Sequence, residues 1–182
     1  MKLFFPKPYA DFVARLRVPC GFVLVAAFAW FSHPDARSLA WGLPVSLAGL
    51  AARAWAAGHL AKNRTLATSG PYGYTRNPLY LGTLTVAAGL AIAARNGGLG
   101  ALFAGVFLGV YLPVIQLEQQ HLRNLFPAYD GYAARVPALL PRMTPAGERQ
   151  PFQWALYVKN REYQAAAGFL AGALFLLWKA MW

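Results

Sequence analysis

The chain has 182 residues, of which 58% are hydrophobic and 13% are charged, and its formal net charge is +11. A soluble domain carries roughly 25% charged residues, so this composition argues against a soluble protein and for a membrane protein. Because the basic residues stand at the ends of apolar runs, they predict contact with anionic lipid headgroups rather than with nucleic acid. The single cysteine, Cys20, excludes an internal disulfide, and three scattered histidines give no spacing for a metal site.

Apolar runs that approach the length needed to cross a bilayer, about 20 residues, recur along the chain. The first run follows a short aromatic and basic segment. Phe4, Phe5 and Pro6 in that segment are atypical of a signal peptide, so we expect the run to be retained as a helix. The sequence predicts five spans, at residues 18–32, 39–58, 79–94, 99–117 and 165–182.

The turns and the polar segments predict how these spans are connected. Asn96 and two glycines make a tight turn, so the third and fourth spans are expected to form an antiparallel hairpin. Pro113 is expected to kink the fourth span, and beyond Glu118 the helix becomes amphipathic and should emerge into water. Residues 121–164, which we call the cap, are polar, aromatic and rich in proline. The expected fold is therefore an all-α integral membrane bundle of about five transmembrane helices with a small cytosolic C-terminal cap, forming one domain over residues 1–182.

The basic residues are unevenly distributed between the two ends of the predicted spans. Lys and Arg exceed Asp and Glu by three in residues 1–17, in the loop at residues 59–78 and in the cap. The turn at residues 32–38 is neutral, and the turn at 95–98 carries a single excess positive charge. By the positive-inside rule, the N-terminus, the loop and the cap are predicted to face the cytosol.

The loop at residues 59–78, which we call the motif loop, carries an unusual density of Gly, Pro and Tyr together with Arg76. Glu118 is the one acidic residue between Asp35 and Asp130, and it is predicted to arrive on the same side of the membrane. It is either a structural partner of Arg76 or an acceptor for ribose hydroxyls or a developing positive charge, and we favour the functional role. Arg53, inside the second span, either extends to the headgroups or binds a buried anion such as a substrate headgroup.

Two segments, residues 64–82 and 118–141, carry an ordered set of motifs. These are Thr65-Leu66, Ser69-Gly70-Pro71-Tyr72, Arg76-Asn77-Pro78-Leu79-Tyr80, Glu118-Gln119, Leu122, Phe126, Tyr129, Tyr132, Val136-Pro137 and Pro141. In order and spacing they resemble the isoprenylcysteine carboxyl methyltransferase and phospholipid methyltransferase group of integral membrane enzymes. Three positions depart from the family pattern: Asn77 replaces a histidine, Gln119 replaces a second glutamate, and Val114 replaces an arginine that helps to hold the substrate in the prenylcysteine enzymes.

The resemblance implies that the protein binds S-adenosyl-L-methionine at the cytosolic membrane face and methylates a lipophilic substrate that enters from the bilayer. Arg76 and Glu118 are the candidate catalytic residues, and Arg53 is the candidate substrate-binding residue. The residues carried over to the cofactor pocket are Arg64, Thr65, Leu66, Ala67, Tyr72, Asn77, Pro78, Leu79, Tyr80 and Glu118.

The acceptor stays open between two chemistries. O-methylation of an isoprenylcysteine-like carboxylate is the first choice, because a carboxylate is already a nucleophile. N-methylation of an ethanolamine-type phospholipid is the alternative, with Glu118 as the base. Two other classes also remain: a membrane reductase of related architecture that binds a nicotinamide cofactor, and a non-catalytic lipid-binding descendant, which the changes at Asn77 and Gln119 leave open.

Overall fold

The computed structural model describes residues 4–147 and 150–182, and that part of the chain is helical, with no strand. A long helix covers each of the five apolar runs. The elements in chain order are α1 (Lys7–Phe31), α2 (Ala36–Ala57), the 3-10 turn η1 (Gly70–Gly73), α3 (Pro78–Ala94), α4 (Gly97–Val106), the π-helical turn η2 (Phe107–Tyr111), α5 (Leu112–Leu125), α6 (Tyr129–Arg135), α7 (Trp154–Lys159) and α8 (Tyr163–Ala180).

Two of the helices pass the length and composition test for crossing a membrane. They are α1 and the continuous helix formed by α4, η2 and α5, at Lys7–Phe31 and Gly97–Leu125, and α3 is a shorter apolar helix. The first helix begins at Lys7 rather than at residue 18, because Pro8 suits a first helical turn and the basic segment after it continues the same helix.

Local capping interactions set where the helices begin and end. At the start of α2, the Ser38 backbone N–H donates to Asp35 Oδ1 at 2.7 Å, and the Asp35 N–H donates to Ser38 Oγ at 3.0 Å. This reciprocal capping box satisfies two backbone donors that the helix leaves free. Between α3 and α4, Arg95 adopts the left-handed region at φ 53° and Asn96 Oδ1 accepts from the Gly98 N–H at 2.9 Å. The predicted hairpin of the third and fourth spans is confirmed.

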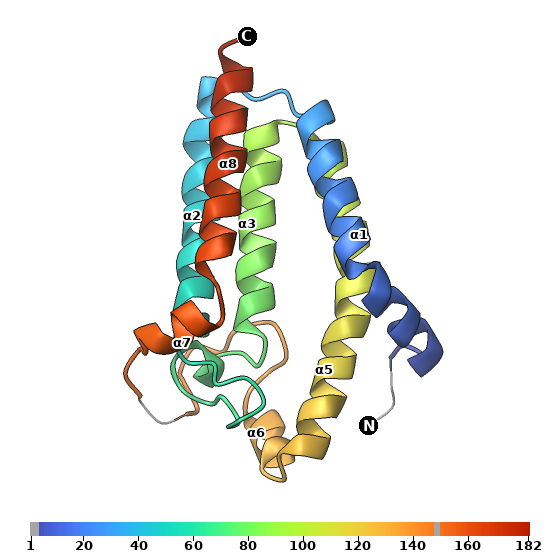
Figure 1. Cartoon of the computed structure of the whole chain (residues 1–182), viewed down its shortest axis with the longest axis vertical. Coiled ribbons are helices and arrows are strands. Elements are labelled where there is room, and N and C mark those ends of the chain that lie inside the picture. The colour runs from blue at the N-terminus through green and yellow to red at the C-terminus, as the bar shows by residue number, and fades with distance from the viewer. Residues whose placement is uncertain (1–3, 148–149) are drawn as a thin grey trace.

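The long helices fall into two groups (Figure 1). Helices α2, α3 and α8 run side by side, and α1 lies along the helix made by α4, η2 and α5. The backbones of α2 and α3 approach closely because glycines seven residues apart face each other, Gly42 and Gly49 on α2 and Gly82 and Gly89 on α3. Ser46 Oγ also donates to the Val86 carbonyl oxygen at 2.9 Å across this contact.

Substituting Gly89 with alanine is expected to destabilise the fold by about 1–3 kcal/mol, because overpacking a close helix contact forces backbone movement. The added Cβ would lie 2.3 Å from Ser46 Oγ and 2.5 Å from the Gly42 carbonyl oxygen. The measurement is the thermal unfolding midpoint of purified protein by circular dichroism. Gly172→Ala in α8 is the matched control, because no heavy atom lies within 4 Å of its Cβ position. Equal shifts in the two variants would show that close packing is not the cause.

A π-helical turn interrupts the long helix directly before Pro113. Pro113 has no N–H to donate to the Gly109 carbonyl, and the hydroxyl of Tyr9 on α1 donates to that oxygen instead, at 2.7 Å. The sequence predicts a kink at Pro113; the structure instead places the irregularity in the turn that precedes it. π-helical turns are frequent at functional sites, and this one ends at Tyr111.

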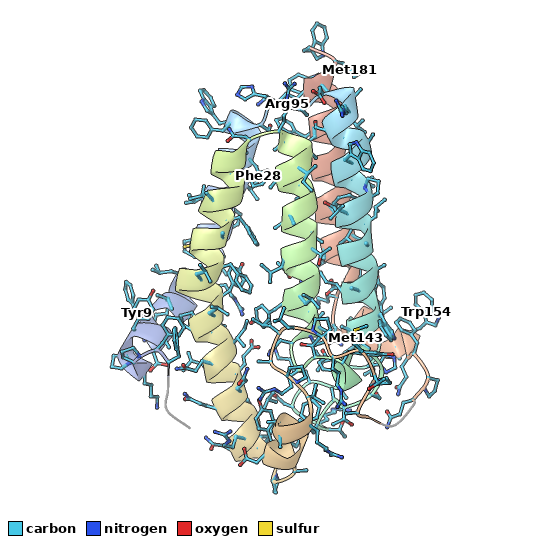
Figure 2. All side chains as sticks on the ribbon, turned by 180° about the vertical axis from the view of Figure 1, so that it is seen from behind. Tyr9, Phe28, Arg95, Met143, Trp154 and Met181 are labelled. Atoms are coloured by element: carbon cyan, nitrogen blue, oxygen red, sulfur yellow. The ribbon has the colours of Figure 1, made fainter. Side chains whose placement is uncertain are left out.

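The start of α1 is held against α5 by a buried side-chain amide. Gln116 Oε1 accepts from the backbone N–H groups of Phe4 and Phe5 at 2.9 and 3.0 Å, and its Nε2 donates to the Phe5 carbonyl oxygen at 2.9 Å. Large apolar side chains are exposed along the helices, as expected of a surface that faces lipid. Figure 2 shows Tyr9 and Trp154 projecting outward near the loop end of the molecule, and Arg95 and Met181 at the opposite end.

Candidate active site

The motif loop folds onto the cap at the end of the molecule where α6 and α7 lie (Figure 1). Gly70 adopts a positive φ of 55°, and a Cβ there would lie 2.6 Å from His59 Nε2, so only glycine fits this turn without strain. The Tyr132 hydroxyl of α6 donates to the Tyr72 carbonyl oxygen at 2.8 Å. Three backbone N–H groups also pair the two segments: Arg76 to Pro137 at 2.9 Å, Arg142 to Tyr74 at 3.0 Å and Ala146 to Gly73 at 2.9 Å.

The polar side chains of Thr75 and Asn77 are used in the same contact. Thr75 Oγ1 and Asn77 Nδ2 both donate to the carbonyl oxygen of Ala138, at 3.1 and 2.8 Å. The amide that stands in place of the family histidine therefore anchors the cap. Asn77 also lines the cavity described next.

A cavity of about 1010 Å³ lies between the motif loop, α1, α3, α5 and α6. Arg64 is exposed and does not line it. The structure therefore brings together all but one of the residues predicted for the site, and these lining residues are Arg53, Thr65, Leu66, Ala67, Tyr72, Arg76, Asn77, Pro78, Leu79, Tyr80 and Glu118.

Glu118 accepts a hydrogen bond from a tyrosine of α3 and not from Arg76. The Tyr80 hydroxyl donates to Glu118 Oε1 at 3.0 Å. The positive charge of Arg17, on α1, also acts on this hydroxyl. The ring of Tyr80 packs edge-on against Tyr111, with centroids 6.2 Å apart, so the residue that ends the π-helical turn becomes part of the same wall.

Arg76 points toward α6. Its Nη1 donates to the Tyr129 hydroxyl at 3.1 Å, and its guanidinium carbon lies 5.9 Å from the centre of the Tyr129 ring. Its Nε atom is buried and has no hydrogen-bond partner among the residues that the structure describes. Buried polar groups are nearly always paired, so this unpaired donor, on a side chain that lines the cavity, marks Arg76 as a candidate ligand-binding residue.

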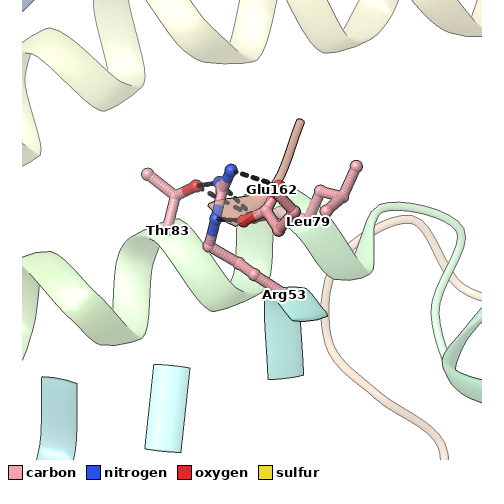
Figure 3. Close-up of polar contacts among 4 residues, drawn as sticks. All are labelled: Arg53, Leu79, Thr83 and Glu162. Carbon is pink, nitrogen blue, oxygen red and sulfur yellow. Dashed lines mark hydrogen bonds and ion pairs between the residues drawn. The ribbon is translucent and has the colours of Figure 1, made fainter. Parts of the chain in front are cut away.

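Arg53 already has an anionic partner within the chain (Figure 3). Its Nε donates to Glu162 Oε1 at 2.6 Å and its Nη2 to Glu162 Oε2 at 3.1 Å. Its Nη1 donates to the hydroxyl of Thr83 and to the Leu79 carbonyl oxygen. Arg53 of the second span therefore binds an anion within the chain. That anion is Glu162, 109 residues away at the start of α8.

Burial keeps the tyrosines around the cavity protonated. It raises the pKa of Tyr72, Tyr129 and Tyr132 above the ordinary value. Burial also lowers the pKa of His59, which favours its neutral form. These tyrosines therefore act as hydrogen-bond donors and not as bases at neutral pH, and Glu118 is the one carboxylate among the described lining residues.

The donor set suits S-adenosyl-L-methionine. Ligand pockets enclose roughly 300–1,000 Å³, and this cavity has that size. Tyrosine rings offer faces to an adenine or a sulfonium, Glu118 offers a carboxylate to ribose hydroxyls, and Arg76 offers an unbonded N–H to the methionine carboxylate. Within residues 4–147 and 150–182, no group of three or more His, Cys, Asp or Glu side chains is arranged to hold a metal ion.

Sequence reasoning did not find the α1 wall or the aromatic partner of Tyr80. Arg17 and Tyr111 line the cavity, but each lies in a run that was interpreted as a membrane span or its flank. The only signal for the α1 wall is a helical spacing, since Arg17, Gly21 and Val25 fall on one helix face. That spacing does not say which neighbour the face meets.

Comparison with known proteins places this site in a family. The family described as "Phospholipid methyltransferase" matches residues 45–128, which run from α2 through the motif loop to the end of α5. The chain is 39% identical over 104 residues to the cobalt-zinc-cadmium resistance protein CzcN of Cupriavidus metallidurans, a match that covers 56% of this chain and 48% of that protein. It is 32% identical over 151 residues to the nickel-cobalt-cadmium resistance protein NccN of Alcaligenes xylosoxydans xylosoxydans, covering 76% of this chain and 71% of that protein.

The match to CzcN thus spans about half the length of that relative. No solved structure matches the chain significantly. The family match covers the motif loop and Glu118, and the 32% identity extends over 71% of the length of NccN. Together with the two helices that are long and apolar enough to cross a membrane, these matches indicate a membrane protein whose family is described as phospholipid methyltransferases. The chain belongs to the phospholipid methyltransferase family.

Proposed function

We propose that the protein transfers a methyl group from S-adenosyl-L-methionine to a lipophilic acceptor held in the membrane, and that the acceptor group is a carboxylate. The observation that carries the proposal is the cavity itself. It contains the motif residues and Glu118, and it continues along an apolar face of α1. A cofactor end and a lipid end within one cavity are what such a transfer requires.

The motif side of the cavity is the proposed cofactor site. Residues 65–67, Tyr72 and Tyr80 would hold the adenosine, Glu118 would accept from the ribose hydroxyls, and Arg76 would bind the amino-acid carboxylate. The cofactor, when bound, supplies an electrophilic methyl group on a positively charged sulfur. The protein's own contribution is to align the acceptor with that group and to exclude water, which is a large part of catalysis in a displacement reaction.

A carboxylate acceptor needs no base, and the protonated tyrosines around the cavity are consistent with that reaction. N-methylation of an ethanolamine-type phospholipid is the second candidate. An ammonium group must lose a proton before it attacks. Glu118 and His121 are the described lining residues that could accept it, and we assign the role to Glu118.

The proposed topology has five transmembrane helices, α1, α2, α3, the α4–η2–α5 helix and α8, with the active site on the cytosolic side. The motif loop, α6 and α7 lie at one end of the molecule (Figure 1), and this end carries a large share of the basic residues. An excess of Lys and Arg on one side supports a cytosolic position for that side.

Two measurements test the proposal. Purified protein is titrated with S-adenosylhomocysteine by calorimetry, and saturable binding is expected. Membranes that contain the protein are then incubated with methyl-labelled donor, and the lipid fraction is treated with alkali. Label that alkali releases indicates a methyl ester, and label that resists alkali indicates a methylated amine. Binding of NADPH in place of S-adenosylhomocysteine would instead support a reductase, and the absence of both binding and label a non-catalytic descendant.

A further inference from the structure

We propose that Arg17 binds the anionic headgroup of the acceptor, and that the apolar face of α1 that follows it holds the acceptor's hydrocarbon tail. This inference rests on the proposed function, because it assigns the acceptor end of the same cavity. It adds a specificity-determining residue on a helix that neither the motif loop nor the family match at residues 45–128 includes.

Four cationic side chains among the described residues line the cavity, and their surroundings differ. Arg53 is committed to Glu162, Thr83 and the Leu79 carbonyl (Figure 3). Arg76 and Lys62 belong to the motif loop, where the cofactor is proposed to bind. Arg17 is the one that α1 contributes, and the lining residues that follow it on α1 are all apolar.

The apolar part of the cavity begins directly after Arg17. Val18, Gly21, Phe22 and Val25 line it, and their spacing places them on one face of α1. From Arg17 to Val25 this face extends about 12 Å at 1.5 Å per residue. Val18, Phe22 and Val25 are 62%, 73% and 68% exposed, and no heavy atom lies within 4 Å of a Cβ at Gly21. The protein leaves this face uncovered, so a hydrocarbon chain has room to lie along it.

The polar neighbours of Arg17 place an acceptor oxygen beside the cofactor pocket. Arg17 interacts with the Tyr80 hydroxyl, and the same hydroxyl donates to Glu118 at 3.0 Å. Tyr80 thus lies between Glu118, on the proposed cofactor side, and Arg17, on the proposed acceptor side. A guanidinium binds a carboxylate with two parallel hydrogen bonds, which fixes its orientation as well as its position. A single-chain carboxylate is therefore the ligand class that this arrangement recognises.

The test uses a fatty acid that carries a photoreactive diazirine in its chain, and the methyl ester of the same compound as the neutral counterpart. The protein is reconstituted in phosphatidylcholine nanodiscs, irradiated with each compound, and the labelled peptides are identified by mass spectrometry. The acid is expected to label α1 and the facing helices of the wild type. Arg17→Gln should lower this labelling by on the order of tenfold or more, because a charge-assisted hydrogen bond is lost.

Arg15→Gln is the matched control, because Arg15 lies on the same helix, is exposed and does not line the cavity. It should leave labelling by the acid unchanged, and Arg17→Lys should retain part of it. The ester should label the wild type and Arg17→Gln equally. Equal labelling of these two proteins by the acid overturns the proposal, as does labelling by the acid outside the cavity.

Calorimetry with S-adenosylhomocysteine separates this inference from the proposed function. Arg17→Gln should bind S-adenosylhomocysteine as the wild type does, and it should elute as the wild type does in size exclusion. Loss of S-adenosylhomocysteine binding with retained acid labelling would assign Arg17 to the cofactor and overturn the inference. A wild type that fails to bind S-adenosylhomocysteine would refute the proposed function. The dependence of acid labelling on Arg17 would still decide whether Arg17 binds the anionic headgroup.

Discussion

Glu118→Gln is expected to weaken binding of S-adenosylhomocysteine by on the order of tenfold to a hundredfold, the range that loss of a hydrogen bond to a charged group produces. Glu118 is the one carboxylate among the described residues that line the cavity, and the Tyr80 hydroxyl orients it at 3.0 Å. Ribose hydroxyls donate to a carboxylate more strongly than to a neutral amide. The substitution keeps the shape of the side chain, so the change in affinity reports its charge.

Calorimetric titration in detergent measures the effect, with two companion variants. Asp11→Asn makes the same change of charge on α1 at an exposed position outside the cavity, and it should bind S-adenosylhomocysteine as the wild type does. Tyr80→Phe removes the orienting hydroxyl and should give a smaller loss than Glu118→Gln. Wild-type affinity in Glu118→Gln would remove Glu118 from the cofactor site.

Glu162→Ala is expected to destabilise the protein by about 2–4 kcal/mol, somewhat less than loss of one partner from a fully buried ion pair, because it leaves a partly buried arginine without its anion. The two side chains are 23% and 9% exposed, and the pair joins the start of α8 to α2 and α3 (Figure 3). The measurement is the free energy of unfolding from denaturant titration followed by tryptophan fluorescence. The double variant Arg53→Met with Glu162→Met should recover a large part of the loss, since replacing both charges removes the desolvation cost.

The comparison pair is Asp35 and Arg95, whose side chains are 42% and 65% exposed at the other end of the helices. Arg95→Ala, which leaves the Asp35 capping box intact, should lower stability far less than Glu162→Ala, because solvent screens exposed ion pairs. A similar loss in the two variants would show that burial does not decide the energetics of the Arg53 pair. Failure of the double variant to recover stability would assign Arg53 a direct packing role in addition to its charge.

Local pattern predicted the helices well, because hydrophobic length, proline and capping residues act within a few positions of each other. The hairpin turn at Asn96 and the predicted end of the first span near residue 32 are confirmed in this way. The close contact between α2 and α3 was not predicted, although its four glycines are visible in the sequence. Spacing within one helix does not say which other helix it packs against, and only the assembled bundle shows that Gly42 meets Gly89.

The same distinction applies to the candidate site, whose segments could be predicted from the sequence and whose side-chain contacts could not. The cavity does gather the motif loop and Glu118, which the order of segments and the charge pattern predicted to share one side. The partners within it were not predicted: Glu118 bonds Tyr80 rather than Arg76, and Arg53 bonds Glu162. These pairings join residues 38 and 109 positions apart, and such distances are set by tertiary packing rather than by local sequence. The roles of the site residues remain predictions for the experiments above.

The way α1 is held has a consequence for biosynthesis. Phe4, just before α1, donates to Gln116, 112 residues away, and Tyr9 of α1 donates to the Gly109 carbonyl oxygen, 100 residues away. At the other end of α1, Lys179 near the end of α8 donates to the Ala29 carbonyl oxygen. Helix α1 is therefore synthesised before the partners that hold its two ends, and it meets them only after the later helices have been made. Until then it must remain in the lipid without them. The α1 wall of the cavity is therefore synthesised before the residues that hold it in place. Truncated chains that end before α5 should lack the assembled wall entirely.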